Sequence, residues 1–159
     1  MFTMQKIMEG YGETGTDIIG ESQEKVKSAQ EMRTEIDILK EGLQNMPSGL
    51  DDDIVASVQA AEQAGREQAT NDIAEVQNQI DQDMAKAEAT KGKVDSQIDI
   101  NNTAGASLEN LKSNIFGGGI DRVIDEIKSN NAVGETIKSN IDAAYQAIRS
   151  QMDDTQNGI

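Results

Sequence analysis

The chain of 159 residues contains no histidine, cysteine or tryptophan, and it has a single proline. Because imidazole and thiol groups are missing, the sequence excludes a zinc finger, a thiol redox centre, a Cys/His nucleophile pair and a histidine general base. Any chemistry would have to come from carboxylates, lysine, tyrosine or hydroxyl groups. The absence of cysteine fits a cytosolic protein and an exported bacterial protein equally well.

Positive charge is also scarce, because 14 Lys and Arg residues stand against 29 Asp and Glu residues, for a formal net charge of -15. A chain this acidic repels phosphate backbones and anionic lipid surfaces, both of which bind clustered lysine and arginine. We therefore expect no nucleic-acid partner. The acidic residues are expected to form solvated helix surfaces that keep the chain soluble.

Long apolar runs are missing as well. No stretch approaches the roughly 20 apolar residues that a membrane-spanning helix needs, so we expect no stable membrane insertion. Residues 1–10 lack the charged-then-apolar pattern of a Sec signal. The sequence therefore predicts a cytoplasmic protein, with a Sec-independent route if the protein is exported.

The apolar residues that are present make up 36% of the chain and recur in steps of three and four, which places them on one face of a helix. This pattern predicts helices over about 15–46, 51–115 and 119–152, in a single helical domain spanning 1–159. The segment Met46-Pro47-Ser48-Gly49 ends the first helix, because proline lacks a donor and glycine suits a C-terminal cap. We expect 153–159 to be a frayed tail.

The predicted fold is all-α, with long antiparallel helical hairpins that share a central helix as a coiled-coil rod. The alternative is a four-helix bundle, which would form if the central helix breaks near 90–105. Folding about the turn at 47–50 would place Leu39 beside Val58 and Met32 beside Gly65.

Folding about the second turn, at 116–119, would place Ile141 beside Val94. It would also bring Asn101-Asn102 near Asn130-Asn131. These polar pairs either hydrogen-bond and fix the register, or they mark breaks in the helices. Such slender hairpins leave apolar surface uncovered, so we expect a helical protein partner or a second copy of the chain.

The many paired carboxylates are explained by helix capping and solvation. A di-metal helical bundle would need histidine, and a calcium loop would need Asp-x-Asp-x-Asp-Gly, and both are missing. The sequence contains no convergent polar constellation. We expect no catalytic residue, metal, cofactor or small-molecule substrate, and therefore no enzyme.

The segment Phe116-Gly117-Gly118 joins two amphipathic helices, and this arrangement resembles the helical hairpins of type VII secretion substrates, the WXG group. Phe116 stands where that family has tryptophan, and Tyr145 is followed four residues later by Arg149, where the family's export signal has an acidic residue. The resemblance covers about 75–152. It implies export or chaperoning by a type VII system, through pairing with a small partner or an LXG-type toxin.

Two functions follow from these observations. The first is a helical binding protein of type VII secretion, a substrate or targeting partner of a larger helical toxin. Its predicted partner-binding residues are Phe116, Gly118, Ile120, Ile124, Ile127, Ile137 and Ile141. The second is a self-assembling coiled-coil spacer or filament-type subunit, indicated by the length of the central helix.

Overall fold

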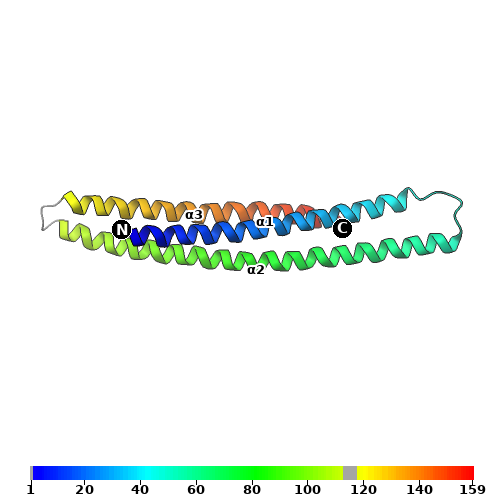
Figure 1. Cartoon of the computed structure of the whole chain (residues 1–159), viewed down its shortest axis with the longest axis horizontal. Helices are drawn as coiled ribbons and strands as arrows, with labels where there is room; N and C mark the ends of the chain where they lie inside the picture. The colour runs from blue at the N-terminus through cyan, green and yellow to red at the C-terminus, as the bar shows by residue number, and fades with distance from the viewer. Residues whose placement is uncertain (1, 113–117) are drawn as a thin grey trace. The chain divides into compact units, whose positions relative to one another are not determined.

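The computed structural model describes residues 2–112 and 118–159, and it contains three helices. They are α1 (Phe2–Gln44), α2 (Asp52–Lys112) and α3 (Gly118–Gln156), which are labelled in Figure 1. No strand occurs among the described residues. The all-α class predicted from the helical spacing of apolar residues is therefore confirmed.

The first helix is longer than predicted, because α1 begins at Phe2 and not near residue 15. The sequence disfavours a helix here, since glycine in a helix interior costs roughly 1 kcal/mol relative to alanine. The segment is nevertheless helical. Two of its glycines, Gly12 and Gly15, lie against isoleucine side chains of α3, and this close packing offsets part of the cost.

The central helix α2 is continuous from Asp52 to Lys112. Asp52 and Asp53 lie in its first turn, where carboxylates interact well with the positive end of the helix dipole. The helix does not break near 90–105, so the four-helix bundle that required this break is not formed. Gly92 is exposed, and a Cβ added there would meet nothing within 4 Å, so the helix accommodates this glycine at its surface.

The connection between α1 and α2 follows the predicted chemistry. The first helix ends at Gln44, shortly before Pro47, and Gly49 adopts a positive φ of 86°. Glycine adopts this left-handed conformation without a steric cost. The backbone amide of Val55 then donates to the carbonyl of Asp51 at 3.0 Å, which starts the hydrogen-bond ladder of α2.

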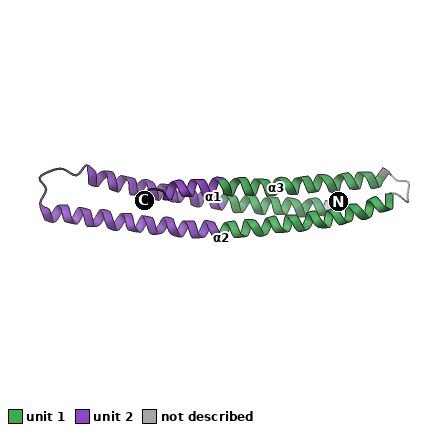
Figure 2. Ribbon diagram, turned by 180° about the vertical axis from the view of Figure 1, so that it is seen from behind, with its two compact units in different colours: residues 1–20, 83–146 green, residues 21–82, 147–159 purple. Residues whose placement is uncertain are grey.

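Two compact units make up the chain, and each contains a segment of all three helices (Figure 2). Unit 1 consists of residues 1–20 and 83–146, and unit 2 consists of residues 21–82 and 147–159. The single domain over 1–159 expected from the sequence stays a prediction.

In unit 1, α2 and α3 run in opposite directions. Lys91 pairs with Asp142, whereas Lys112, farther along α2, pairs with Asp121, which lies earlier in α3. The register differs from the predicted one by less than one helical turn. The side chains that fill this interior are mainly aliphatic, and the buried apolar residues are Met8, Ala87, Val94, Ile124, Ile127, Ile141 and Tyr145.

Unit 2 has a different register from the predicted one. A Cβ added to Gly65 would lie 3.0 Å from Leu39 Cδ1, so Gly65 faces Leu39 and not Met32. This is a shift of one heptad from the predicted register. The buried apolar residues of this unit are Val26, Ala29, Ile36, Ala69, Ile73, Val76, Ile80, Ile148 and Met152.

The predicted frayed tail is bound to α1 within unit 2. The third helix continues to Gln156, and Arg33 Nη1 donates to the carbonyls of Thr155 at 3.0 Å and Asn157 at 2.6 Å. The last carbonyls of a helix have no partner inside the helix, and a cation satisfies them well. The prediction missed this contact because Arg33 is 122 residues away from Thr155 in the sequence.

Candidate partner-binding surface

The predicted site begins at the connection between α2 and α3. Phe116, its aromatic residue, and Gly117 lie outside the described residues. Gly118 is the first residue of α3, and Ile120, in the first turn, is partly exposed. The role of this turn in partner binding stays a prediction.

The isoleucines farther along α3 turn toward the interior of unit 1. Ile124, Ile127 and Ile141 are 5%, 4% and 2% exposed, and Ile137 is half-buried. Their spacing in the sequence places them on one face of the helix. The structure therefore gathers the predicted stripe on one face, and contacts within the chain cover it. Partner binding by these residues stays a prediction.

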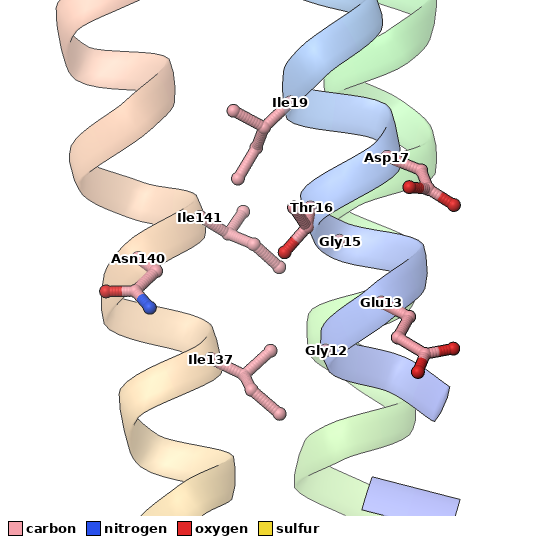
Figure 3. Close-up of a pocket in the computed structure, with 9 residues that line it drawn as sticks. All are labelled: Gly12, Glu13, Gly15, Thr16, Asp17, Ile19, Ile137, Asn140 and Ile141. Atoms are coloured by element: carbon pink, nitrogen blue, oxygen red, sulfur yellow. The ribbon is translucent and has the colours of Figure 1, made fainter. Parts of the chain in front are cut away.

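The N-terminal part of α1 covers two of these isoleucines. A Cβ on Gly12 would lie 3.3 Å from Ile137 Cδ1, and one on Gly15 would lie 3.1 Å from Ile141 Cδ1. Figure 3 shows both isoleucine side chains pointing from α3 toward these glycines, while Glu13 points away from α3. Because an added Cβ would be in tight contact with an isoleucine at both positions, glycine gives these side chains room to pack against α1.

The signal for this contact was present in the sequence. Met8, Gly12, Gly15 and Ile19 are spaced four, three and four residues apart, which forms a stripe on one face of a helix. Met8 is 0% exposed, and a Cβ on Gly134 of α3 would lie 2.9 Å from its Cε atom. The stripe was missed because glycine does not count as apolar, although it occupies positions that face the core.

A layer of asparagines lies beside the isoleucine stripe in unit 1. Asn101 of α2 is 0% exposed, and its Nδ2 donates to Oδ1 of Asn130 at 2.9 Å and of Asn131 at 2.8 Å. Asn131 in turn donates to Asn102 Oδ1 at 2.8 Å. The prediction that these asparagines hydrogen-bond between helices is therefore confirmed. The alternative prediction, that they mark breaks in the helices, is wrong.

The asparagine layer also contacts α1. Asn130 Nδ2 donates to the backbone carbonyl of Met4 at 3.4 Å, and Gln97 Nε2 donates to Asn101 Oδ1 at 2.9 Å. No buried side-chain nitrogen or oxygen lacks a hydrogen-bond partner in the described part of the chain. A buried amide that is satisfied in one alignment loses its partners when a helix slides, so such a layer specifies register.

Ion pairs flank the contact between α2 and α3. Lys91 Nζ lies 2.5 Å from Asp142 Oδ1, and Lys138 Nζ lies 2.5 Å from Asp95 Oδ1. The hydrogen bond to the aspartate raises the pKa of each lysine above its ordinary 10.5, more than burial lowers it. The carboxylates are well exposed, so solvent screens both pairs and each contributes little to stability.

The third pair of this kind lies closest to the predicted binding turn. Lys112 Nζ lies 2.6 Å from Asp121 Oδ1, and this hydrogen bond raises the pKa of Lys112. The pair joins the last residue of α2 to the first turn of α3. Both side chains are well exposed, so this contact, like the other two pairs, contributes little to stability.

Over residues 2–112 and 118–159, no group of three or more acidic residues is placed to hold a metal ion. Within the same ranges, no helix is both long and apolar enough to cross a membrane. The arrangement that the described side chains do build is a set of helix-to-helix contacts, with isoleucine against glycine and asparagine against asparagine.

Comparison with known proteins gives no relative for this chain. No family profile, no curated protein and no solved structure matches it. The function is therefore argued from the packing described above.

Proposed function

We propose that the chain is a non-enzymatic helical binding protein associated with type VII secretion, acting as a substrate or as the targeting partner of a larger helical toxin. In this proposal two helical hairpins share α2, and a helix of the partner packs on the isoleucine stripe of α3. The resemblance at Phe116-Gly117-Gly118 supports the type VII setting. The packing of α1 on α3 supports the mode of binding.

The observation that carries the proposal is the composition of the α1 segment that covers the stripe. Residues 2–20 contain four glycines, at positions 10, 12, 15 and 20. Each lowers the intrinsic stability of the helix by roughly 1 kcal/mol relative to alanine. Gly12 and Gly15 recover part of this in close packing, but a Cβ at Gly10 or Gly20 would meet nothing within 4 Å.

Segment 2–20 is therefore a low-stability cover on an apolar stripe. A partner helix of higher helix propensity competes with this segment for Ile137 and Ile141. Release of the segment also breaks the bond between Asn130 and the Met4 carbonyl. This hydrogen bond contributes only about 1 kcal/mol net, and release also exposes Met8, so the partner helix has to bury a comparable apolar surface.

The first test is affinity purification of the tagged chain from its native cells, with mass spectrometry of the co-eluting proteins. We expect an LXG-type toxin, a small helical secretion partner or a type VII ATPase. Phe116→Ala is expected to remove the partner while most helicity remains. Retention of the partner by this variant and by Ile124→Asp would overturn the proposed site.

Because Ile124 is buried, Ile124→Asp also destabilises unit 1, and a second variant separates binding from folding. Gly10→Ala combined with Gly20→Ala stabilises segment 2–20 without entering any contact. We expect this variant to be more stable and to recover less partner. Unchanged recovery would show that the partner does not compete with α1.

The alternative function is a self-assembling coiled-coil spacer, and the exposure of large apolar side chains favours it. In unit 1, Ile100 is 60% exposed and Val133 is 47% exposed. Light scattering of the purified chain distinguishes the two functions. An elongated homo-oligomer in the absence of any partner would support the spacer, and a monomer would count against it.

A further inference from the structure

The apolar stripe of α2 in unit 2 extends beyond the helix that covers it. Ala69, Val76 and Ile80 are 6%, 8% and 1% exposed, and they lie on the face that packs inside the unit. Counting back along α2 in steps of four and seven residues from this face leads to Val58 and Ile54. At about 100° per residue, Val58 lies within about 40° of these buried residues around the helix, and Ile54 lies within about 80°, at the edge of the face. The two side chains are 38% and 50% exposed.

The exposure has a definite cause in the chain. Gly65 is the residue of this face that still meets α1, at Leu39. Since α1 and α2 run in opposite directions about their connection (Figure 2), Val58 lies level with residue 46, beyond the end of α1 at Gln44. Ile54 and Val58 therefore lie past the point where α1 stops, and the exposed Ala61 lies seven residues after Ile54 on the same side of α2. We call these three residues the α2 end surface.

The charge around this surface is strongly negative. Residues 31–67 contain nine acidic and three basic residues. Arg33 is bound to Asp37 and to backbone carbonyls of the C-terminal segment, with the Asp37 contact at 3.2 Å.

The other two basic residues of this stretch are engaged as well. Arg66 pairs with Glu62 at 3.2 Å, and Lys40 donates to the Gly158 carbonyl at 3.5 Å. The remaining carboxylates, including Asp51, Asp52 and Asp53 just before Ile54, thus face solvent without a cation from this stretch. A second copy of the chain would bring the same negative charge to the contact, whereas a basic partner would neutralise it.

We propose that the α2 end surface is a docking site for a basic amphipathic helix of another protein. The apolar face of that helix would cover Ile54, Val58 and Ala61, and its lysines or arginines would lie near Asp51 to Asp53. Helices commonly bind this way, with apolar anchors at i, i+3, i+4 and i+7 in a groove. The surface shares no residue with the isoleucine stripe of α3, so this proposal goes beyond the proposed function and fails independently of it.

The test uses the full chain and a synthetic fluorescent peptide of about 18 residues, long enough for five helical turns. The peptide has leucines on one helical face and lysines elsewhere, and a matched peptide has glutamate in place of lysine. We expect saturable binding of the lysine peptide by fluorescence anisotropy. Ile54→Ser combined with Val58→Ser is expected to weaken it roughly tenfold or more.

A matched control is available on α1 of the same unit. Ile38 is 62% exposed, so Ile38→Ser removes an equally accessible isoleucine that does not belong to the α2 end surface. We expect this variant to bind like the wild type. Asp52→Asn combined with Asp53→Asn removes two negative charges beside the surface at nearly constant side-chain size and is expected to weaken binding a few-fold, most at low salt.

Three outcomes would overturn the proposal. The first is equal affinity of the wild type and the Ile54/Val58 double variant, with helicity unchanged by circular dichroism. The second is equal affinity for the lysine and glutamate peptides. The third is self-association of the wild type that the same double variant abolishes, which would assign the surface to a second copy.

Discussion

Both units have mainly aliphatic interiors, but unit 1 also contains a layer of hydrogen-bonded asparagine amides. Among its described residues unit 2 has no such layer, and its buried polar residues are Ser22, Glu62 and Thr155. The two units also differ in their glycines. In unit 1, a Cβ added to Gly12, Gly15 or Gly134 would lie within 3.3 Å of a side chain on a neighbouring helix. Among the described glycines of unit 2, only Gly65 has such a close neighbour. Aliphatic burial supplies more free energy per residue than neutral hydrogen bonds do. Buried amides supply alignment. We infer that unit 2 is built for stability and unit 1 for register.

The largest expected effect is the loss of an aliphatic side chain from unit 2. Ile73 is 1% exposed, so Ile73→Ala is expected to lower the free energy of unfolding by about 2–5 kcal/mol through lost burial and a cavity. Ile38→Ala, at an exposed position of the same unit, is expected to change it by less than about 0.5 kcal/mol. Urea denaturation followed by circular dichroism measures both. Similar decreases in the free energy of unfolding for the two variants would contradict the burial of Ile73 in the interior of unit 2.

Removal of the asparagine layer is expected to have the next largest effect. Asn101→Ala leaves the side-chain oxygens of Asn130 and Asn131 without their donor, which costs about 1–3 kcal/mol. Hydrogen exchange with mass spectrometry is expected to show the loss of protection mainly in unit 1. Asn140→Ala, at an exposed position of α3, is the control and should leave exchange unchanged. An equal loss of protection in both units would contradict the conclusion that the asparagine layer stabilises unit 1 specifically.

A pair of glycine substitutions tests the close packing in unit 1. A Cβ on Gly134 would lie 3.1 Å from both Val94 Cγ1 and Ile98 Cδ1, and overpacking of about 1–3 kcal/mol exceeds the helix-propensity gain of about 1 kcal/mol. Gly134→Ala is therefore expected to lower the melting temperature. Gly92→Ala, where a Cβ meets nothing within 4 Å, is expected to raise it. An increase in melting temperature for both variants would show that a Cβ at Gly134 fits without overpacking.

The smallest effect concerns the ion pairs that flank α2 and α3. The pKa values of Lys91, Lys112 and Lys138 are raised above 10.5, chiefly by hydrogen bonds to aspartates. A raised pKa in the folded state gives stabilisation that is fully present below 10.5 and is lost as pH rises through the higher folded value. We expect a small decrease in the free energy of unfolding above that pH. Lys138→Gln should reduce this decrease, and Lys93→Gln, at an exposed position, should not.

The register shows what the sequence could and could not predict. A stripe of similar aliphatic residues matches its neighbour almost as well after a slide of one heptad, because the same apolar positions meet again. The pairing of Leu39 was therefore wrong by seven residues in unit 2. In unit 1 the asparagines break this degeneracy, and the register predicted from folding about the turn at 116–119 was close to the observed one.

The start of α1 and the end of α3 were missed for another reason. Both depend on contacts between residues that are far apart in the sequence, such as Gly12 with Ile137 and Arg33 with Thr155. Local propensity indicates no helix near Gly12, and only tertiary packing overrides it. The existence of the three helices and the continuity of the α2 stripe could be predicted, because they follow from periodicity alone.

The position of Pro47 has a consequence for how such chains can diverge. An insertion of seven residues before Met46 would lengthen α1 by about two turns and keep its apolar phase within about 20°. The longer helix would then reach the level of Val58 and Ile54 and cover them. A single insertion at this connection would thus cover the α2 end surface, without any change in the residues that form it.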